Sequence, residues 1–498
     1  MNLYVVMKDK YIKLSKNSFV RFYDDGALGY ITNQLTKQDR AYNETGADFL
    51  KQITRKPRTI CECVEKLKCV YEDVSIVELE NDFTKFVENL AKVKFVLIGD
   101  DYNGVDSSDF EFSYSMENPK TMIADYTQQT DEDSEYETQS YLLKHDDKFP
   151  RLTSMQFELT SLCNERCIHC YIPSNIKDNG VRMPLPTFKK TIDQFVELGG
   201  LDVTLSGGEA LLHKDIAEML RYCREKDLQI TILSNLTLLK DELIPVLKET
   251  NVSQIQVSLY SMNPDTHDMI TTVKGSFKKT KKAIEKLYAA DVPVQISCPA
   301  MKENYKDFID VAKYAQSLKM KAHCDYNLIA QEDTGTENLQ HRLSLPETEE
   351  LLKSIVKFNT NYQELIATET QDVKIKPEEM NSMPLCGVGR NTLCITANGD
   401  IFPCAGWQDY VVGNIYKTTL KEVWNNNEKV RELRTFKKSV FPQCMTCDAV
   451  DYCAPCLVAN YNESGGDMFK LSEHRCATSH INKRIVEEWL ATQSASKK

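Results

Sequence analysis

The 498-residue chain lacks long apolar runs, and no stretch reaches the about 18 uncharged apolar residues that a membrane-spanning helix requires. Its first apolar stretch, Leu3 to Met7, is too short for the hydrophobic region of a secretory signal. An excess of positive charge is also absent, since the net charge is −12. We therefore expect a soluble, cytoplasmic protein of about two to four folding units, with no membrane partner and no nucleic-acid partner.

Cysteine, in contrast, is abundant. The chain has 17 cysteines, and the odd count rules out complete intramolecular pairing. Without a secretory signal the compartment should be reducing, where clustered cysteines hold metals or do chemistry more often than they form disulfides. The cysteine clusters are therefore the first place to look for function.

The negative charge is concentrated in one segment. Residues 100–147 hold 14 Asp and Glu but only two Lys, so the rest of the chain is nearly neutral. We interpret residues 100–150 as a flexible, self-repelling linker. The alternative is that this segment attracts a basic partner electrostatically.

Residues 1–99 are expected to form a small α+β domain of the winged helix-turn-helix type. Short apolar stretches alternate with turns, and helical patterns follow after Asn43, near 59–70 and over 76–92. DNA binding is not favoured, because 16 Lys and Arg are balanced by 14 Asp and Glu in this region. Binding of a peptide along a strand edge suits the region better.

From Met155 onward strand and helix signals alternate, which predicts an α/β fold with six β/α repeats and a parallel sheet curved toward a barrel. Six repeats are fewer than the eight of a closed barrel, so we expect an open, partial barrel with its active residues at the carboxyl ends of the strands. The predicted strands are 155–160, 203–205, 230–234, 255–259, 294–297 and 322–328. The predicted helices are 186–198, 212–226, 241–249, 276–290 and 305–319, with a helical bridge near 346–358.

Three cysteines follow the first predicted strand with the spacing C-x-x-x-C-x-x-C: Cys163, Cys167 and Cys170. Three thiolates are one too few to close a tetrahedral zinc site or to ligate all four irons of a cubane cluster. An iron without a protein ligand can coordinate a substrate or a cofactor. A zinc knuckle with a distant fourth ligand is the structural alternative.

This motif resembles the signature of the radical SAM superfamily, in which the fourth iron chelates S-adenosylmethionine (SAM). The stretch Ser206, Gly207, Gly208 and Glu209 ends the second predicted strand and resembles the family's binding site for the SAM amino group. Glycines permit close backbone approach, and a carboxylate pairs with an ammonium group. The resemblance also implies SAM contacts at later strand ends, from Ser234, Asn235 and Ser258, although these could be ordinary turn residues. The family often has Asp where this chain has Tyr260, so that contact is unassigned.

Eight more cysteines lie in the C-terminal region: Cys386, Cys394, Cys404, Cys444, Cys447, Cys453, Cys456 and Cys476. Together with Gly399 and Gly413-Asn414-Ile415 they resemble the SPASM extension of peptide-modifying radical SAM enzymes, which binds two auxiliary 4Fe-4S clusters. By this resemblance one cluster would take Cys386, Cys404 and Cys456. The other would take Cys444, Cys447, Cys453 and Cys476. The chain would then hold three 4Fe-4S clusters, one that binds SAM and two auxiliary, with zinc as the alternative metal.

Two features depart from the SPASM pattern. Only two residues separate Cys453 from Cys456, where the family usually has three. Cys394 is additional to the seven cysteines that the family usually has. In a strand, alternation places its side chain on the opposite face from those of Leu393 and Ile395. It could close the first auxiliary cluster or be a bystander. Among the cysteines outside these groups, Cys61, Cys69 and Cys223 are interpreted as buried structural thiols.

Residues 1–99 also resemble the leader-peptide recognition element joined to such enzymes. The expected domains are that element at 1–99, the acidic linker at 100–150, the radical SAM partial barrel at 151–342, a helical bridge at 343–385, the SPASM domain at 386–485 and a tail at 486–498.

The resemblance implies an enzyme that installs thioether cross-links, from Cys sulfur to carbon, in a ribosomally synthesised precursor peptide. A 5′-deoxyadenosyl radical would abstract a substrate hydrogen, and an external low-potential donor such as flavodoxin or ferredoxin would supply the electron. Three alternatives remain: carbon–carbon cross-linking, formylglycine formation in a sulfatase, and a zinc-stabilised peptide-binding protein without catalysis. The sequence assigns no catalytic base.

Overall fold

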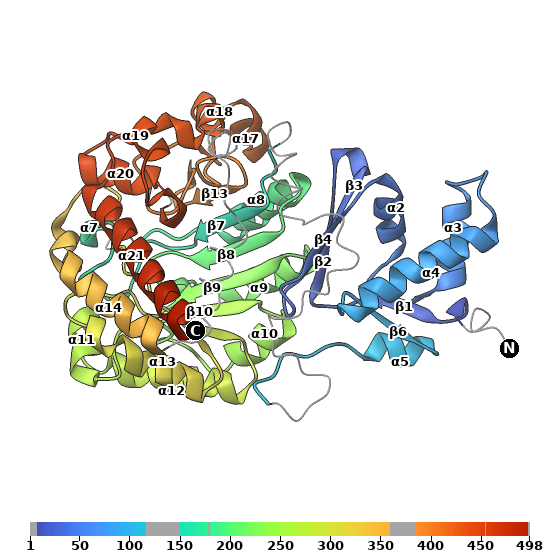
Figure 1. Ribbon diagram of the computed structural model, residues 1–498. Helices are drawn as coiled ribbons and strands as arrows, with labels where there is room; N and C mark the ends of the chain where they lie inside the picture. The colour runs from blue at the N-terminus through green and yellow to red at the C-terminus, as the bar shows by residue number, and fades with distance from the viewer. Residues whose placement is uncertain (1–6, 116–149, 178–179, 359–383, 454, 497–498) are drawn as a thin grey trace.

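The computed structural model describes residues 7–115, 150–177, 180–358, 384–453 and 455–496. Figure 1 shows three regions: an N-terminal module, a central sheet flanked by helices, and a C-terminal region that lies against one end of that sheet. None of the described helices is long and apolar enough to cross a membrane.

The N-terminal module contains two antiparallel three-stranded sheets, in the orders β5-β1-β6 and β2-β3-β4. The three predicted helices are present and bury one face of each against the sheets; α3 begins at a capping box formed by Thr59 and Glu62. The strands are β1 (Tyr11–Leu14), β2 (Ser18–Tyr23), β3 (Leu28–Asn33), β4 (Asp39–Tyr42), β5 (Arg58–Thr59) and β6 (Val96–Gly99). The helices are α2 (Glu44–Gln52), α3 (Ile60–Lys68) and α4 (Ile76–Lys92).

The central sheet confirms the predicted partial barrel. All six predicted strands occur, adjacent in chain order and parallel, as β7 (Ser154–Glu158), β8 (Asp202–Ser206), β9 (Gln229–Ser234), β10 (Gln254–Ser258), β11 (Val294–Ser297) and β12 (Lys321–His323). The predicted helices occur as α8 (Leu185–Glu197), α9 (Ile216–Glu225), α10 (Leu243–Glu249), α12 (Ser276–Ala289) and α13 (Phe308–Ser317). A further short helix, α11 (Pro264–Thr271), was not expected. Asn263 caps its start and Pro264 occupies its first turn.

The C-terminal region extends the same sheet. Strand β13 (Thr392–Ile395) pairs in parallel with β7, and β14 (Asp400–Phe402) and β15 (Gly413–Asn414) follow in antiparallel order. The full order is β12-β11-β10-β9-β8-β7-β13-β14-β15. The cysteine-rich region therefore continues the barrel's sheet on the side of β7.

The predicted boundary of the acidic linker is wrong, because residues 100–115 are folded. They include α5 (Tyr102–Ser107), and the Asp109 carboxylate accepts hydrogen bonds from the Ser15 hydroxyl (2.8 Å) and the Lys16 amide (3.0 Å). Tyr114 is buried on the barrel, where its hydroxyl donates to the Val292 carbonyl (3.1 Å). Lys10, Lys13 and Lys16 form ion pairs with Asp100, Asp109 and Glu111, which offsets part of the repulsion in this segment. The remainder of the expected linker, 116–149, lies outside the described residues.

The predicted C-terminal tail at 486–498 is also wrong for the residues that the structure describes. Helix α21 (Glu473–Ser496) continues through position 486 without a break. It packs along α14 (Leu345–Phe358), where Ile481 and Ile485 are buried against Leu352 and Val356. This apolar contact extends the helix beyond the expected end of the domain.

Arg21 joins the N-terminal module to the barrel. Its guanidinium donates from Nε to the Gly200 carbonyl (2.6 Å) and from a terminal nitrogen to the Asp227 carbonyl (2.7 Å). Close by, the Tyr23 hydroxyl donates to the Gly199 carbonyl (3.1 Å). The module is thus held by hydrogen bonds at one end of the barrel.

We expect Arg21→Ala to lower the free energy of unfolding by about 2–3 kcal/mol, because it leaves two carbonyl groups without a charged donor. Chemical denaturation followed by circular dichroism would measure the change. Arg40→Ala is the control, since that guanidinium bonds the adjacent Asp39 carbonyl; it should cost less than about 0.5 kcal/mol. Equal losses in the two variants would contradict the role of Arg21.

Candidate functional site

The first group of thiols lies in the loop between β7 and α7 (Ser174–Lys177), as the sequence predicts. This loop is tied to α11 by backbone hydrogen bonds from Arg166 to Thr271 (3.2 Å) and from Ile168 to Ile270 (3.0 Å). Burial raises the pKa of Cys167, and the nearby charge of Cys170 adds to the shift. None of the 17 cysteines is in a disulfide. The unexpected helix α11 therefore supports the loop that carries Cys163, Cys167 and Cys170.

Gly207 and Gly208 lie directly against the start of this loop. The Gly208 amide donates to the Thr160 carbonyl (2.9 Å), and the Glu209 amide donates to the Leu162 carbonyl (2.8 Å). A Cβ atom on Gly208 would lie 2.3 Å from the Leu162 carbonyl oxygen. Gly207 has φ +128, and a Cβ atom there would lie 2.4 Å from the Thr160 carbonyl oxygen. Only glycine allows this close approach of the two loops.

Glu209 is buried, and its carboxylate accepts hydrogen bonds from the Ser234 hydroxyl (2.7 Å) and the amides of Asn235 (2.8 Å) and Leu211 (3.0 Å). Burial raises the Glu209 pKa, while these hydrogen bonds oppose the shift. The sequence predicted Ser234 and Asn235 as separate SAM contacts. The structure brings both of them to Glu209, so that the three residues form one polar group.

Ser206 and Ser258 lie at the carboxyl ends of β8 and β10, on the expected edge of the sheet. The Ser258 side chain is hydrogen bonded to Tyr260, whose hydroxyl approaches the Cys167 sulfur at 3.7 Å. The residue at the position that departs from the family pattern thus contacts the cysteine loop.

Two charged residues at this site were missed in the sequence. Lys177 is 2% exposed and forms a hydrogen bond with the Cys170 side chain. Burial would lower the Lys177 pKa, but the charges of Cys170, Cys163 and Cys167 outweigh it and raise the pKa. Burial raises the pKa of Glu165 to about 7, and its carboxylate lies 3.6 Å from the Cys167 sulfur. Glu165 occupies an unspecified position of the C-x-x-x-C-x-x-C motif and Lys177 lies outside it, so no sequence signal marks either residue.

The second group of thiols is Cys386, Cys404 and Cys456. Burial raises the Cys404 pKa to about 12, and the charges of Cys456 and Cys386 contribute. The structure therefore brings together the three cysteines that the sequence assigned to one cluster, including the irregularly spaced Cys456. Cys394 is buried close enough to Cys404 and Glu158 for their charges to raise its pKa further.

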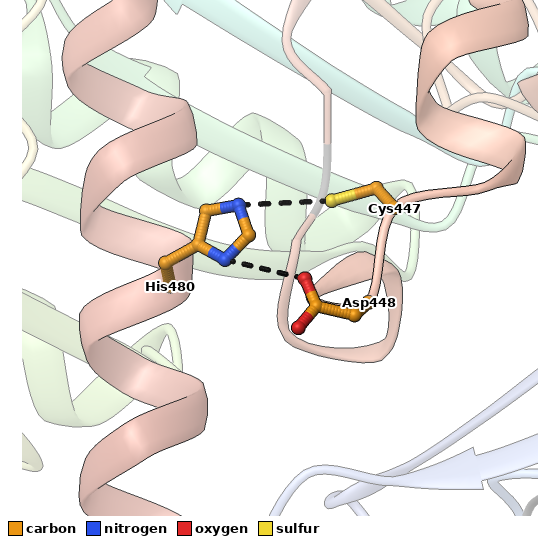
Figure 2. Close-up of side chains that lie close together, drawn as sticks. All are labelled: Cys447, Asp448 and His480. Carbon is orange, nitrogen blue, oxygen red and sulfur yellow. Dashed lines mark hydrogen bonds and ion pairs between the residues drawn. The ribbon is translucent and has the colours of Figure 1, made fainter.

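The third group lines one pocket in the C-terminal region and comprises Cys444, Cys447, Cys453 and Cys476. His480 of α21 lies at the same pocket, as Figure 2 shows, with Nε2 at 3.8 Å from the Cys447 sulfur and Nδ1 at 3.4 Å from the Asp448 carboxylate. Cys447, Asp448 and His480 could hold a metal ion by themselves, but Asp448 and His480 are exposed. Four thiols around one pocket suit a 4Fe-4S cluster better than this incomplete triad.

The remaining cysteines are only partly as expected. Cys223 is buried, which confirms its structural interpretation, but Cys61 and Cys69 are exposed on the N-terminal module. Cys61 lies on α3 away from its buried face, which Ile60, Cys63, Val64 and Leu67 form, and Cys69 directly follows the helix. Neither exposed thiol belongs to a group that could hold a cluster.

The fold and the site together define a class of protein. A partial β/α barrel that presents three thiols and a glycine-glycine-glutamate turn at the carboxyl ends of its strands is the framework of a radical SAM protein. Residues 157–315 match the radical SAM superfamily, and residues 386–448 match the SPASM iron-sulfur cluster-binding domain. The chain is therefore a radical SAM enzyme with a SPASM domain, which binds SAM and iron-sulfur clusters.

Similar proteins include the AdoMet-dependent heme synthase of Methanosarcina barkeri, 28% identical over 64% of this chain and 93% of that protein. The subtilosin biosynthesis protein AlbA of Bacillus subtilis is 28% identical over 64% of this chain and 70% of its own length. The crystal structure of Streptococcus suis SuiB bound to its precursor peptide SuiA has the same fold, with a TM-score of 0.64 at 18% identity. That match covers 93% of this chain and 99% of SuiB, so it includes part of residues 1–99.

We expect Gly208→Ala to lower 5′-deoxyadenosine production by at least about 100-fold, because the new methyl group forces the glutamate turn away from the cysteine loop. The measurement is SAM cleavage by the reconstituted, reduced enzyme. Gly465→Ala is the control, since Gly465 ends α20 (Leu457–Ser464) at φ +76 with nothing within 4 Å of an added Cβ. It should cost about 1 kcal/mol of stability and leave cleavage intact. Normal cleavage by Gly208→Ala would refute the assigned role of this turn.

Proposed function

We propose that this enzyme is a maturase that installs thioether cross-links, from Cys sulfur to carbon, in a ribosomally synthesised precursor peptide. The observation that carries the proposal is the N-terminal module. The fold shared with SuiB extends into residues 1–99, and the SuiB structure contains a bound precursor peptide. The similarity to AlbA, a subtilosin biosynthesis protein, also supports a role in peptide maturation.

The three groups of thiols are proposed to hold three 4Fe-4S clusters. The group Cys163, Cys167 and Cys170 would hold the cluster that binds SAM, whose cleavage supplies a 5′-deoxyadenosyl radical for hydrogen abstraction. The other two groups would hold the auxiliary clusters. Glu209 would receive the SAM ammonium group, and the glycine pair would allow the backbone to approach it. Lys177 would offset the negative charge of the thiolates in a site shielded from water.

The N-terminal module is proposed to bind the leader of the precursor peptide as an added strand. In the described part of the chain, β4 pairs only with β3, so its other edge is available. At the opposite edge of that sheet, β2 faces the barrel through Arg21 and Tyr23. An added strand would gain main-chain hydrogen bonds along β4, and the aromatic pair Tyr42 and Phe86 lies beside it.

Three other functions are compatible with a radical SAM enzyme: carbon–carbon cross-linking, heme synthesis and sulfatase maturation. Carbon–carbon cross-linking would use the same barrel and clusters, and only the product distinguishes it. Heme synthesis is the activity of the Methanosarcina barkeri relative, whose similarity spans 64% of this chain, as that of AlbA does. A heme synthase or a sulfatase maturase would not need a leader-binding module. We therefore place the peptide maturase first.

The proposal predicts that the reconstituted enzyme, with SAM, a low-potential reductant and the precursor peptide encoded beside its gene, removes two hydrogens from the peptide for each cross-link. Mass spectrometry of the product checks this, and fragmentation locates the bond. Cys167→Ala should abolish both SAM cleavage and product. SAM cleavage with an unchanged peptide would contradict the proposed function.

Removal of the leader from the peptide should reduce cross-linking by at least about tenfold at low peptide concentration, because binding along β4 is lost. The initial rate with full-length and leaderless peptides measures this effect. As a control, the leader is added as a separate peptide to the leaderless substrate, so that the leader is present but not covalently attached. Equal rates for the two peptides would contradict the proposed binding of the leader by the N-terminal module.

A further inference from the structure

Two buried carboxyl groups, Glu158 and Glu332, lie between the cysteine loop and the C-terminal region, and no motif accounts for them. Glu332 is 1% exposed, and neither of its carboxylate oxygens has a hydrogen-bond partner. Glu158 is 6% exposed; one oxygen accepts a bond from the Gln408 amide (2.8 Å) and the other has no partner. Each buried polar group without a partner costs about 1–3 kcal/mol. A pair with a purely structural role would therefore destabilise the folded protein without a compensating contact.

Glu158 points to the inner face of the barrel. Side chains alternate along β7, and Met155, Phe157 and Leu159 are buried in the core, where the Phe157 ring packs on Phe188 of α8 at 5.0 Å. Glu158, between them, faces the opposite side. It pairs in register with Ser206, the first residue of the proposed SAM-binding stretch.

Glu332 is held close to the cysteine loop. Its amide donates to the carbonyl of Tyr171, the residue that follows Cys170 (3.0 Å). The Asn462 side chain donates to the Gly406 carbonyl (2.8 Å) and the Ala330 carbonyl (3.4 Å), which joins the Glu332 segment to the C-terminal region. Both carboxyl groups thus lie between the first thiol group and the segment that carries Cys404.

The two groups also interact electrostatically. Burial raises the Glu158 pKa to about 7, and the Gln408 hydrogen bond opposes the shift. Burial raises the Glu332 pKa to about 9, and the negative charge of Glu158 adds to it. Near pH 7 Glu332 is therefore neutral and Glu158 is close to the midpoint of its titration, so Glu158 is the member that can take up a proton.

We propose that Glu158 and Glu332 form a carboxyl pair that contacts the substrate peptide and accepts the proton released as the cross-link closes. The proposal rests on the function proposed above. It assigns Glu158, which Gln408 holds, as the ionised member, and Glu332 as the neutral member that shares the incoming proton.

The chemistry balances with the components already named. Thioether formation breaks one C–H bond and one S–H bond and makes one C–S bond. The carbon gives a hydrogen atom to the 5′-deoxyadenosyl group derived from SAM. The thiol gives a proton to the carboxyl pair, and the remaining electron passes to an oxidised iron-sulfur cluster of the SPASM domain. The external donor supplies the electron that cleaves SAM.

The test compares Glu158→Gln and Glu332→Gln in the full-length, reconstituted enzyme. Each variant should form cross-linked peptide about 100-fold more slowly, because general-base assistance is lost. The ratio of 5′-deoxyadenosine to cross-linked peptide should rise at least about tenfold, since hydrogen abstraction precedes proton loss. Glu332→Asp should recover part of the product. Glu349→Gln is the control, since that carboxylate pairs with Arg484 on α21. An unchanged ratio in both Gln variants would overturn the proposal.

A second measurement does not depend on the reaction. Infrared difference spectra upon peptide binding should contain a band of a protonated carboxyl group that is absent from Glu332→Gln. Absence of the band from the wild type would overturn the pair even if cross-linking occurs. If the wild type forms no cross-link, the function fails, and the band still tests the pair. A divalent metal that is retained by the wild type and lost from both Gln variants would make the pair a metal site and refute the proposal.

Discussion

Parallel pairing between β7 and β13 is the contact on which the arrangement of the chemical groups depends. It joins segments more than 200 residues apart in the sequence, with Cys394 in register with Gln156 and Ile395 with Phe157. Strand β7 leads directly into the cysteine loop, and β13 begins the C-terminal region. Because both belong to one hydrogen-bonded sheet, a strand ladder rather than a flexible connection fixes the spacing of the thiol groups. Sites positioned by strands are held more precisely than sites positioned by loops.

The sheet also explains why so many titratable groups near the site have raised pKa values. Parallel strands are covered by helices on one face, and the C-terminal region lies against the carboxyl end of β7, so the groups there lose contact with water. Burial is the largest cause of the shifts at Glu158, Glu209 and Glu332. The only buried cation beside the first thiol group in the described residues is Lys177, which is bound to Cys170. An excluded-water site of this kind strengthens every electrostatic contact with a bound substrate.

Local patterns predicted most of the fold, and the resemblance to radical SAM and SPASM proteins predicted the thiol groups. The alternation of strand and helix signals along the chain located the six barrel strands. Side-chain alternation within one strand placed Cys394 on the face opposite Leu393 and Ile395, which are both in the core. The β7–β13 pairing was not predictable, because no local pattern specifies contacts between distant segments. Glu332 and Lys177 were missed for a different reason. Their importance comes from burial, and a lone charged residue in a sequence is usually exposed.

The position of the N-terminal module bears on the proposed transfer of a peptide to the barrel. A flexible linker over residues 100–150 would let the module carry a bound peptide toward the thiol groups. However, Arg21 holds the module to the barrel, and Tyr114 returns the chain to β11 through the Val294 amide (2.8 Å). The described residues before 116 therefore already hold the module against the barrel. Under the proposed function, a peptide bound along β4 would itself span the distance to the thiol groups, at no more than about 3.3–3.6 Å per residue. The number of residues between its leader and its cross-linked segment would then determine which side chains reach the carboxyl pair.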